Sequence, residues 1–460
     1  MFKRFNFRVF NGVYLVWRQA VRRFTRHGIL VLYGLAFSAM VGLDTKLTLA
    51  YQAFTLLSAF ILLALAGSLR FKARFEVRRT MPRFCTAGEP FLYTLTVRNL
   101  TAKAQNGLFA MEDLGDPRPS LPVFLNSREP GEEDRNLFDR ASGWHRWVWL
   151  LGQTRGATIH RVWLPLLAPR GSVNVKAAIM PFRRGRVDLS GIIIGRPDPL
   201  GLAAATVFVP ARESILVLPR RYVVPGVSLP GLRKYQPGGV AMASRVGDSE
   251  EFAALRDYRP GDPLRRIHWK SWAKTGKPVV REFQEEFFVR HALVLDTFQE
   301  KTYSHAFEEA VSVAASFAYT VKTQDSLLDL IFVGARAYCF TSGRGISHVE
   351  KTMEILSSVA PCTDKPFGVL AGEVLSRVSL FSGCICVLLD WDQQRQDFIQ
   401  SLKALHVPLL VIVIQDSDEK QGVPRDLGPM KSDPDHFIVL DAGNVEEQLA
   451  RWGAHVKRHP

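Results

Sequence analysis

Hydrophobic positions near the start of the chain form two long apolar runs. Residues 27–43 and 47–69 contain no Lys, Arg, Asp or Glu. A membrane-spanning helix needs about 20 predominantly apolar residues, which the second run supplies and the first approaches. Asp44, Thr45 and Lys46 leave room only for a tight turn. The two runs therefore predict a transmembrane helical hairpin.

Between residues 71 and 219, short runs alternate apolar and polar residues and are separated by turn residues. This period of two predicts β-strands, and many short strands favour an immunoglobulin-like sandwich. We expect the acidic, Pro-rich interval 115–140 to be a loop inserted between strands. Trp144, Trp147 and Trp149 follow it, and we expect them in the core or at an edge of the sandwich, or in an exposed contact patch.

From about residue 290 onward, the pattern changes to apolar strands that alternate with helices. This order predicts an α/β domain with a doubly wound parallel sheet and helices on both faces. Ligands of such sheets bind at the carboxyl ends of the strands. Asp296, Asp390 and Asp392 follow apolar strands and are therefore expected at that edge.

Charge is distributed unevenly along the chain. The formal net charge is +15, but the first 80 residues carry 13 Lys and Arg against two acidic residues. The remainder is close to neutral and lacks the basic stripe that nucleic-acid binding requires. Basic residues flank both ends of the predicted hairpin, so the positive-inside rule places both ends in the cytoplasm. Residues 2–17 interleave aromatic and basic side chains, which favours contact with an anionic inner leaflet.

Residues 247–289 combine a Pro-Gly-Asp turn with closely spaced Arg, Asp, Glu and Trp residues. The order of these residues resembles the signature of a bacterial family called domain of unknown function 58. Two upstream segments, Arg-Arg-Gly-Arg at 183–186 and Asp-Pro-Leu-Gly-Leu at 198–202, resemble a second feature of that family. The signature residues that we single out are Glu251, Arg256, Tyr258, Asp262, Arg265, His268, Trp269, Arg281, Glu285 and Glu286.

The signature segment has two interpretations, and both can hold. One is a structural network of ion pairs and aromatic contacts that locks an irregular segment. The other is a docking surface for a partner or an acidic ligand, for which Arg is well suited. Trp269 and Trp272 are spaced along one face of a helical turn, and either can stack on a guanidinium group. A structural role is favoured for His268, because no Cys or Ser partner can be assigned to it.

The resemblance implies that the C-terminal domain is similar to von Willebrand factor A domains, which bind a divalent cation through Asp-x-Ser-x-Ser after the first strand. The matching positions are Asp296, Phe298 and Glu300, and Phe298 has no oxygen to offer a metal. The motif is therefore degenerate, and no metal is expected. Otherwise Asp296 caps a helix or pairs with an arginine of the signature segment. The weak candidates for an unusual cation site are Asp296, Glu300, Asp390 and Asp392.

These patterns divide the chain into six segments. They are a basic cytoplasmic segment (1–27), a two-helix transmembrane hairpin (28–70), an immunoglobulin-like β-sandwich (71–219), a linker (220–246), the family signature (247–289) and a von Willebrand factor A-like α/β domain (290–460).

The sequence contains no G-x-S-x-G, Walker A, H-E-x-x-H or strand-linked G-x-G-x-x-G motif, so we expect a non-enzymatic protein without a cofactor. The resemblance implies an adaptor that works with an AAA+ ATPase of the MoxR type. The lipid bilayer is the other expected partner, with the chain crossing the inner membrane more than once and its soluble domains in the cytoplasm. The alternative function is divalent-metal-dependent ligand binding by the strand-end carboxylates.

Overall fold

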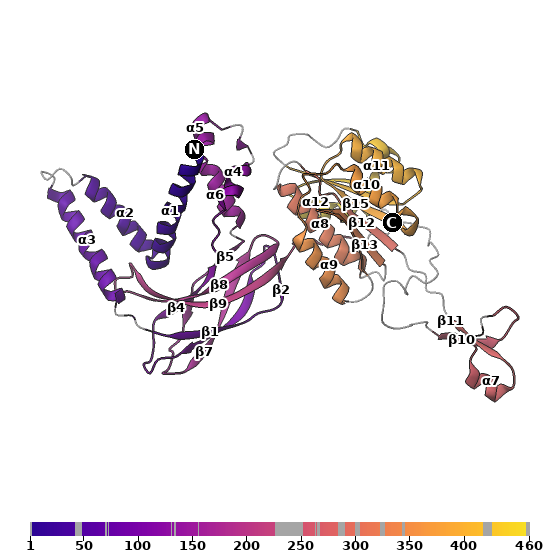
Figure 1. Cartoon of the computed structure of the whole chain (residues 1–460), viewed down its shortest axis with the longest axis horizontal. Helices are drawn as coiled ribbons and strands as arrows, with labels where there is room; N and C mark the ends of the chain where they lie inside the picture. Colours follow the sequence, from indigo (N-terminus) through magenta and orange to yellow (C-terminus); the bar gives the residue numbers. More distant parts are fainter. Residues whose placement is uncertain are drawn as a thin grey trace. The chain divides into compact units, whose positions relative to one another are not determined.

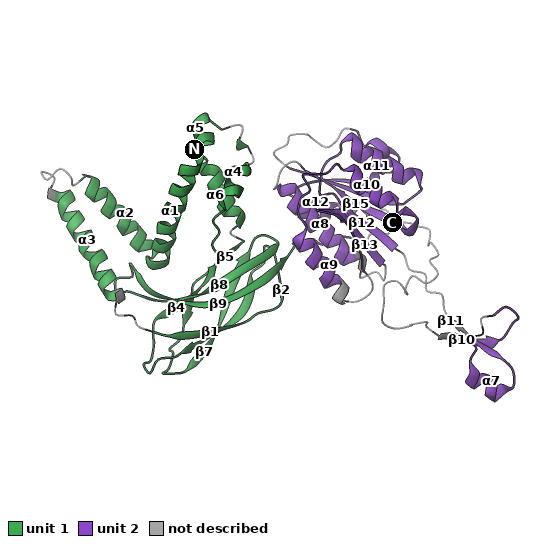
Figure 2. Cartoon of the chain, viewed as in Figure 1, with its two compact units in different colours: residues 1–220 green, residues 221–460 purple. Residues whose placement is uncertain are grey.

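The chain folds into two compact units, residues Met1–Arg220 and Arg221–Pro460, which Figure 2 colours separately. This computed structural model describes residues 2–41, 48–69, 71, 73–129, 131–132, 135–154, 156–225, 252–262, 264, 267–283, 290–299, 304–322, 327–342, 346–416 and 426–456. The predicted turn at 44–46 and most of the predicted linker at 220–246 lie outside these residues.

Three helices open unit 1: α1 (Phe2–Arg23), α2 (Arg26–Val41) and α3 (Thr48–Leu69), as Figure 1 shows. At 1.5 Å per residue, the 22 residues of α3 extend about 33 Å, enough for the roughly 30 Å apolar core of a bilayer. Helix α2 has 16 residues and reaches only about 24 Å. Among the described residues, α3 is thus the one helix long and apolar enough to cross a membrane. The sequence predicts two such spans.

The β part of unit 1 consists of two sheets. One has the order β1 (Phe75–Thr80), β3 (Phe91–Asn99), β7 (Ser172–Pro181) and β5 (Ala157–Ile159). The other has the order β2 (Phe84–Thr86), β9 (Ala204–Leu218), β8 (Gly185–Pro197), β4 (Leu108–Leu114) and β6 (Val162–Leu164). The sheets share a single apolar core, to which alternate residues of β3, β4, β8 and β9 contribute. Along β3 the alternation in the sequence corresponds to one buried and one more exposed face, whereas much of β4 and β8 is buried on both faces.

A buried ion pair joins the two sheets. The Arg79 side chain on β1 donates to both carboxylate oxygens of Glu112 on β4, at 2.9 and 2.7 Å. Both side chains are almost completely buried, and Tyr93 of β3 donates its hydroxyl to the same carboxylate. Arg79 also donates to the carbonyl of Ala211 on β9 at 2.6 Å. Because each charge is paired and hydrogen-bonded, the two can be buried together.

The interval between β4 and β5 is helical, with α4 (Leu121–Asn126), α5 (Leu137–Ser142) and α6 (Trp144–Thr154). The expectation of a loop at 115–140 is therefore wrong for the residues of α4 and α5. The three tryptophans lie on α6 instead of in the sandwich core. Trp147 and Leu150 pack there with Phe124 of α4 and with aromatic side chains of α1. Spacings of three and four along the helix, not the spacing of two between Trp147 and Trp149, determine the buried face.

Unit 2 contains a six-stranded sheet. Its order is β14 (Ala337–Ser342), β13 (Leu327–Val333), β12 (Arg290–Leu295), β15 (Gly383–Leu388), β16 (Leu409–Gln415) and β17 (Phe437–Asp441). All neighbouring pairs are parallel except β13 with β14. The central strands are apolar on both faces because helices cover both faces, as Figure 1 shows. These helices are α8 (His305–Lys322), α9 (Ile346–Ser358), α10 (Gly368–Leu375), α11 (Gln393–Ala404) and α12 (Val445–Val456).

We expect the Glu112→Ala substitution to lower the free energy of unfolding of unit 1 by about 3–5 kcal/mol, because it leaves the Arg79 charge buried without its partner. Glu76→Ala is the matched control: Glu76 pairs with Arg98, whose side chain is 58% exposed, and its loss should cost less than about 1 kcal/mol. Urea unfolding of the full chain followed by tryptophan fluorescence measures both. Equal losses in the two variants would contradict the role given to the buried pair.

Candidate functional site

The signature segment forms a two-stranded antiparallel ribbon that encloses a short helix. Strand β10 (Phe252–Asp257) pairs with β11 (Val279–Phe283), and helix α7 (Trp269–Thr275) lies between them in the sequence. The amide of His268 donates to the carbonyl of Val279 at 2.8 Å and ties the start of the helix to the ribbon. Ile267 is buried and forms a bridge with Val280. The segment therefore has its own hydrogen-bonded framework.

The predicted Pro-Gly-Asp turn is present and is held by an arginine. The Arg256 guanidinium donates to both carboxylate oxygens of Asp262, at 2.8 Å each, and the amide of Arg259 donates to the same carboxylate at 2.9 Å. Gly261 has a φ of +106°, which a residue with a Cβ rarely adopts. Hydrogen bonds from Arg256 lower the pKa of Asp262 to about 2. The turn is thus rigid and charged at neutral pH.

A stacked pair of tryptophans lies on α7, which follows this turn in the sequence. Trp269 and Trp272 stack on each other with ring centroids 5.2 Å apart, so in this structure their partner is another indole and not a guanidinium. Trp269 is 64% exposed, and Leu264 in the same segment is 68% exposed. His268 places Nδ1 2.6 Å from the hydroxyl of Ser271, which orients the first turn of α7.

Two further signature residues belong to the ribbon. Tyr258 donates its amide to the carbonyl of Pro278 at 2.9 Å, which closes the ribbon next to β10. Arg281 lies on β11, opposite Leu255. The signature residues that fall outside the described residues are Glu251, Arg265, Glu285 and Glu286.

At the carboxyl end of β12, an arginine occupies the position next to the strand-end carboxylate. Asp296 is fully buried and accepts hydrogen bonds from the amides of Phe298 and Leu389 and from Arg395 Nε, the last at 2.7 Å. Arg395 also donates to Asp392 at 2.7 Å, and Asp392 caps helix α11 by accepting from the Arg395 amide. Asp296 thus pairs with Arg395 of α11, whereas the expectation named an arginine of the signature segment.

Burial raises the pKa of Asp296, although Arg395 and the backbone donors oppose the shift. Phe298 is buried against Phe367, so it contributes to the core and not to a ligand set. Asp390 is exposed and accepts from the amide of Trp391, and Glu300 lies outside the described residues. Within the part of the chain that is described, no cluster of His, Cys, Asp and Glu has the arrangement of a metal site.

A second region was not singled out from the sequence as a site. The corner between α1 and α2 rests on the loop Asp198–Leu202, which joins β8 to β9. The Thr25 amide donates to the Leu202 carbonyl at 2.9 Å, and the Thr25 hydroxyl donates to the Gly201 carbonyl at 2.6 Å. Asp198 shapes the loop by accepting from the amides of Leu200 and Ala203.

The end of α3 reaches the same loop. A Cβ placed on Gly67 would lie 3.6 Å from Pro199, in ordinary contact. The Asp-Pro-Leu-Gly-Leu segment that resembles a family feature is therefore the place where the start of α2 and the end of α3 both meet the β domain. The order of its residues resembles a family feature, but nothing in the local sequence indicates that the helices it contacts lie more than 100 residues upstream.

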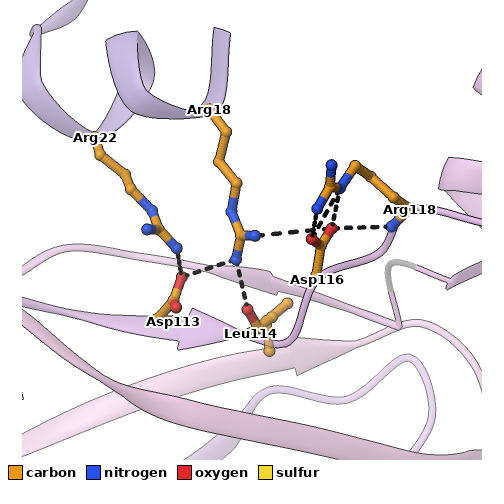
Figure 3. A network of polar contacts seen from close by, with 6 residues as sticks. All are labelled: Arg18, Arg22, Asp113, Leu114, Asp116 and Arg118. Atoms are coloured by element: carbon orange, nitrogen blue, oxygen red, sulfur yellow. Dashed lines mark hydrogen bonds and ion pairs between the residues drawn. The ribbon is translucent and has the colours of Figure 1, made fainter. Parts of the chain in front are cut away.

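An arginine network joins α1 to the end of β4 (Figure 3). Arg18 and Arg22 on α1 both bind Asp113, and Arg18 also donates to the Leu114 carbonyl at 3.1 Å. Asp116 is bound by Arg118 and lies 3.8 Å from Arg18. Hydrogen bonds from Arg118 lower the pKa of Asp116. Beside the network lies a cavity of about 820 Å³ between α1, the start of α2, and strands β4 and β8.

Residues 254–439 match the family model described as protein of unknown function DUF58. This part of the chain belongs to that family. A relative, the uncharacterized protein YeaD of Bacillus subtilis (strain 168), is 26% identical over 230 residues, which are 49% of this chain and 55% of YeaD. The match thus spans about half the length of that relative.

Solved structures resemble the chain only weakly. The CARDB domain of PF1109 from Pyrococcus furiosus, crystallised with di-metal ions, matches at 10% identity and a TM-score of 0.18, covering 32% of this chain and 93% of that one. The sporulation control protein Spo0M of Bacillus subtilis matches at 10% identity and a TM-score of 0.15, covering 32% and 50%. Scores this low carry no argument, so the description of the fold rests on strand order and packing.

In the DUF58 segment, we expect the Arg256–Asp262 turn to lose protection as the pH falls from about 4 to about 2. The carboxylate has a folded pKa below its unfolded value of about 3.9, so its contribution is present above that value and disappears on protonation. Amide hydrogen exchange of residues 256–262, referred to intrinsic rates, measures the change. Asp262→Asn is the control, and protection that still falls over this range in the Asn variant would show that another group is responsible.

Gly28→Ala should detach the helix corner from the β8–β9 loop, because the new Cβ would lie 1.9 Å from the Leu202 carbonyl oxygen. The expected cost is about 1–3 kcal/mol, seen as exchange of the Thr25 amide that is at least roughly tenfold faster. Gly12→Ala on α1 is the matched control, since its Cβ would meet nothing within 4 Å. Unchanged exchange at Thr25 in Gly28→Ala would rule out the close approach.

Proposed function

We propose that this protein is a membrane-anchored, non-enzymatic scaffold that binds a protein partner through its signature segment. The observation that carries the proposal is Trp269, which is 64% exposed and stacked on Trp272, in the same segment as the turn held by Arg256 and Asp262. Exposed tryptophan on a rigid framework is typical of interaction hot spots, because a large apolar area is presented at little entropic cost. Leu264 extends the apolar surface of the same segment.

The proposed anchor is the α2–α3 hairpin, with both helices entering the membrane. The start of α2 and the end of α3 contact the same loop, Asp198–Leu202, which supports a hairpin that enters and leaves on one side. Large apolar side chains are exposed on both helices, as lipid contact would require: Leu30, Tyr33, Phe37 and Met40 on α2, and Leu49, Leu56, Leu62 and Leu63 on α3. The basic residues that flank the hairpin support a cytoplasmic location for the remainder of the chain.

The proposed partner is an AAA+ ATPase of the MoxR type, and the proposed fold of unit 2 is von Willebrand factor A-like. The parallel order of β13, β12, β15, β16 and β17 supports this fold, as the shared core of the two sheets in unit 1 supports an immunoglobulin-like sandwich. Metal-dependent ligand binding is the weaker candidate. Arg395 already donates hydrogen bonds to both Asp296 and Asp392, so a cation there would have to displace a buried guanidinium.

We expect Trp269→Ser to reduce capture of the ATPase by roughly thirtyfold, the loss typical of a hot-spot residue. Crosslinking in intact membranes, followed by affinity purification of the full chain and immunodetection of the ATPase, measures it. Trp163→Ser is the matched control, because Trp163 is 63% exposed but lies on β6 in unit 1. Equal capture by both variants would overturn the docking role of the signature segment, and no capture by the wild type would remove the ATPase as the partner.

A further inference from the structure

The cavity of about 820 Å³ in unit 1 is lined by more positive than negative side chains. Arg18 and Arg22 share one carboxylate, that of Asp113, so two positive charges face one negative charge there. Arg186 is bound to Asp188 at 2.8 Å. Each acidic residue of the lining therefore has an arginine partner. The pairs are Asp113 with Arg18 and Arg22, Asp188 with Arg186, Asp116 with Arg118, and Glu112 with Arg79.

Two further arginines of the lining, Arg26 and Arg161, have no carboxylate partner among the residues that the structure describes. The Arg161 guanidinium lies over the ring of Phe109, 4.7 Å from its centroid. This contact orients the guanidinium plane and leaves its N–H groups available for a ligand. Partial burial lowers the pKa of Arg161, and the positive charge of Arg26 lowers it further. A negative ligand near the two arginines would stabilise both charges and so oppose both effects.

Neutral donors lie beside the two arginines. His27 follows Arg26 at the start of α2, His160 precedes Arg161, and both residues line the cavity. An imidazole N–H can donate to an anionic oxygen without needing a positive charge. Two guanidinium groups and two imidazole rings thus provide several hydrogen-bond donors, which suits the several oxygens of a phosphate group.

The surface around the cavity is suited to a membrane. Helix α1 packs one aromatic face on α4 and α6, but a second apolar face is exposed. Phe5, Val9, Val13 and Val16, spaced three and four residues apart, are 65%, 43%, 55% and 70% exposed. An apolar face next to basic residues is the pattern of a helix that lies in the membrane interface. Its basic face carries the arginines of Figure 3, so the cavity opens beside the same helix.

We propose that this cavity binds the phosphate group of an anionic membrane lipid, held by Arg26 and Arg161 with His27 and His160 as further donors. The exposed apolar face of α1 and the long apolar helix α3 favour a lipid over a soluble phosphate, because they bring the cavity to the bilayer surface where the lipid is concentrated. The lipid phosphate neutralises the arginine pair. The site thereby couples the α1–α2 corner and the β5–β6 segment to the composition of the membrane.

The full chain in nanodiscs that contain both phosphatidylcholine and phosphatidylglycerol tests this proposal. After mild detergent extraction, native mass spectrometry gives the ratio of the two lipids retained per protein. We expect phosphatidylglycerol to be enriched on the wild type. The enrichment should fall roughly tenfold in an Arg26→Gln, Arg161→Gln double variant, because each arginine contributes separately to attraction for an anionic lipid. It should be kept by Arg161→Lys, which retains the charge.

Arg212→Gln with Arg336→Gln is the control of matched charge, since both arginines are exposed and neither lines the cavity. Equal retention ratios in the two double variants would overturn the site. No enrichment on the wild type would overturn it without any variant, so a variant that fails to fold does not protect the proposal. Inorganic phosphate added in excess is the last arm: if it displaces the lipid completely, or if it alone slows amide exchange of residues 157–162, the ligand is a soluble phosphate and the lipid assignment is wrong.

Discussion

Two main chains approach closely at the corner between α1 and α2, and this contact ties the N-terminal helices to the β domain. The corner between α1 and α2 lies on the loop Asp198–Leu202 with only a glycine, Gly28, between them, and Thr25 bonds to the loop through both its amide and its hydroxyl. Backbone groups buried in such a close contact need hydrogen-bond partners. The Thr25 hydrogen bonds therefore determine how the corner is positioned on the loop. The arginine network, the cavity and the two apolar helices all take their places relative to the β domain from this corner.

In both units, arginines that are buried or half-buried pair with buried carboxylates. Arg79 pairs with Glu112, Arg146 with Glu132, Arg290 with Asp329, and Arg395 with Asp296. Breaking such a pair leaves a charge without a partner and costs several kcal/mol, so each pair opposes alternative packings of the strands and helices that it joins. In unit 2 this has a chemical consequence, because the same guanidinium that stabilises Asp296 and Asp392 takes up the oxygens that a hard cation would need.

The sequence predicts most of what is periodic or local. The parallel sheet follows from apolar strands alternating with helices, and the signature turn follows from Pro, Gly and Asp at fixed positions. The helix α6 was missed because Trp147 and Trp149 mimic the spacing of a strand, while the helical spacing from Trp144 to Trp147 and Leu150 competes with it. Of the two predicted spans, α3 is long and apolar enough to cross a bilayer, whereas α2 has 16 described residues and reaches only about 24 Å. Arg395 was not identified as the partner of Asp296, since 99 residues separate them and only the completed sheet brings them together.

The β8–β9 hairpin determines where the chain leaves unit 1. Strand β9 begins next to the loop on which the helices rest and continues for 15 residues, which at about 3.3 Å each is a length of roughly 50 Å. Its hydrogen bonds to β8 extend from Ala204 to Val217, so it cannot flex independently at either end. The hairpin is therefore stiff along its length, and a tilt of helices α2 and α3 by a few degrees, if transmitted through the loop, would displace residue 218 by several ångströms.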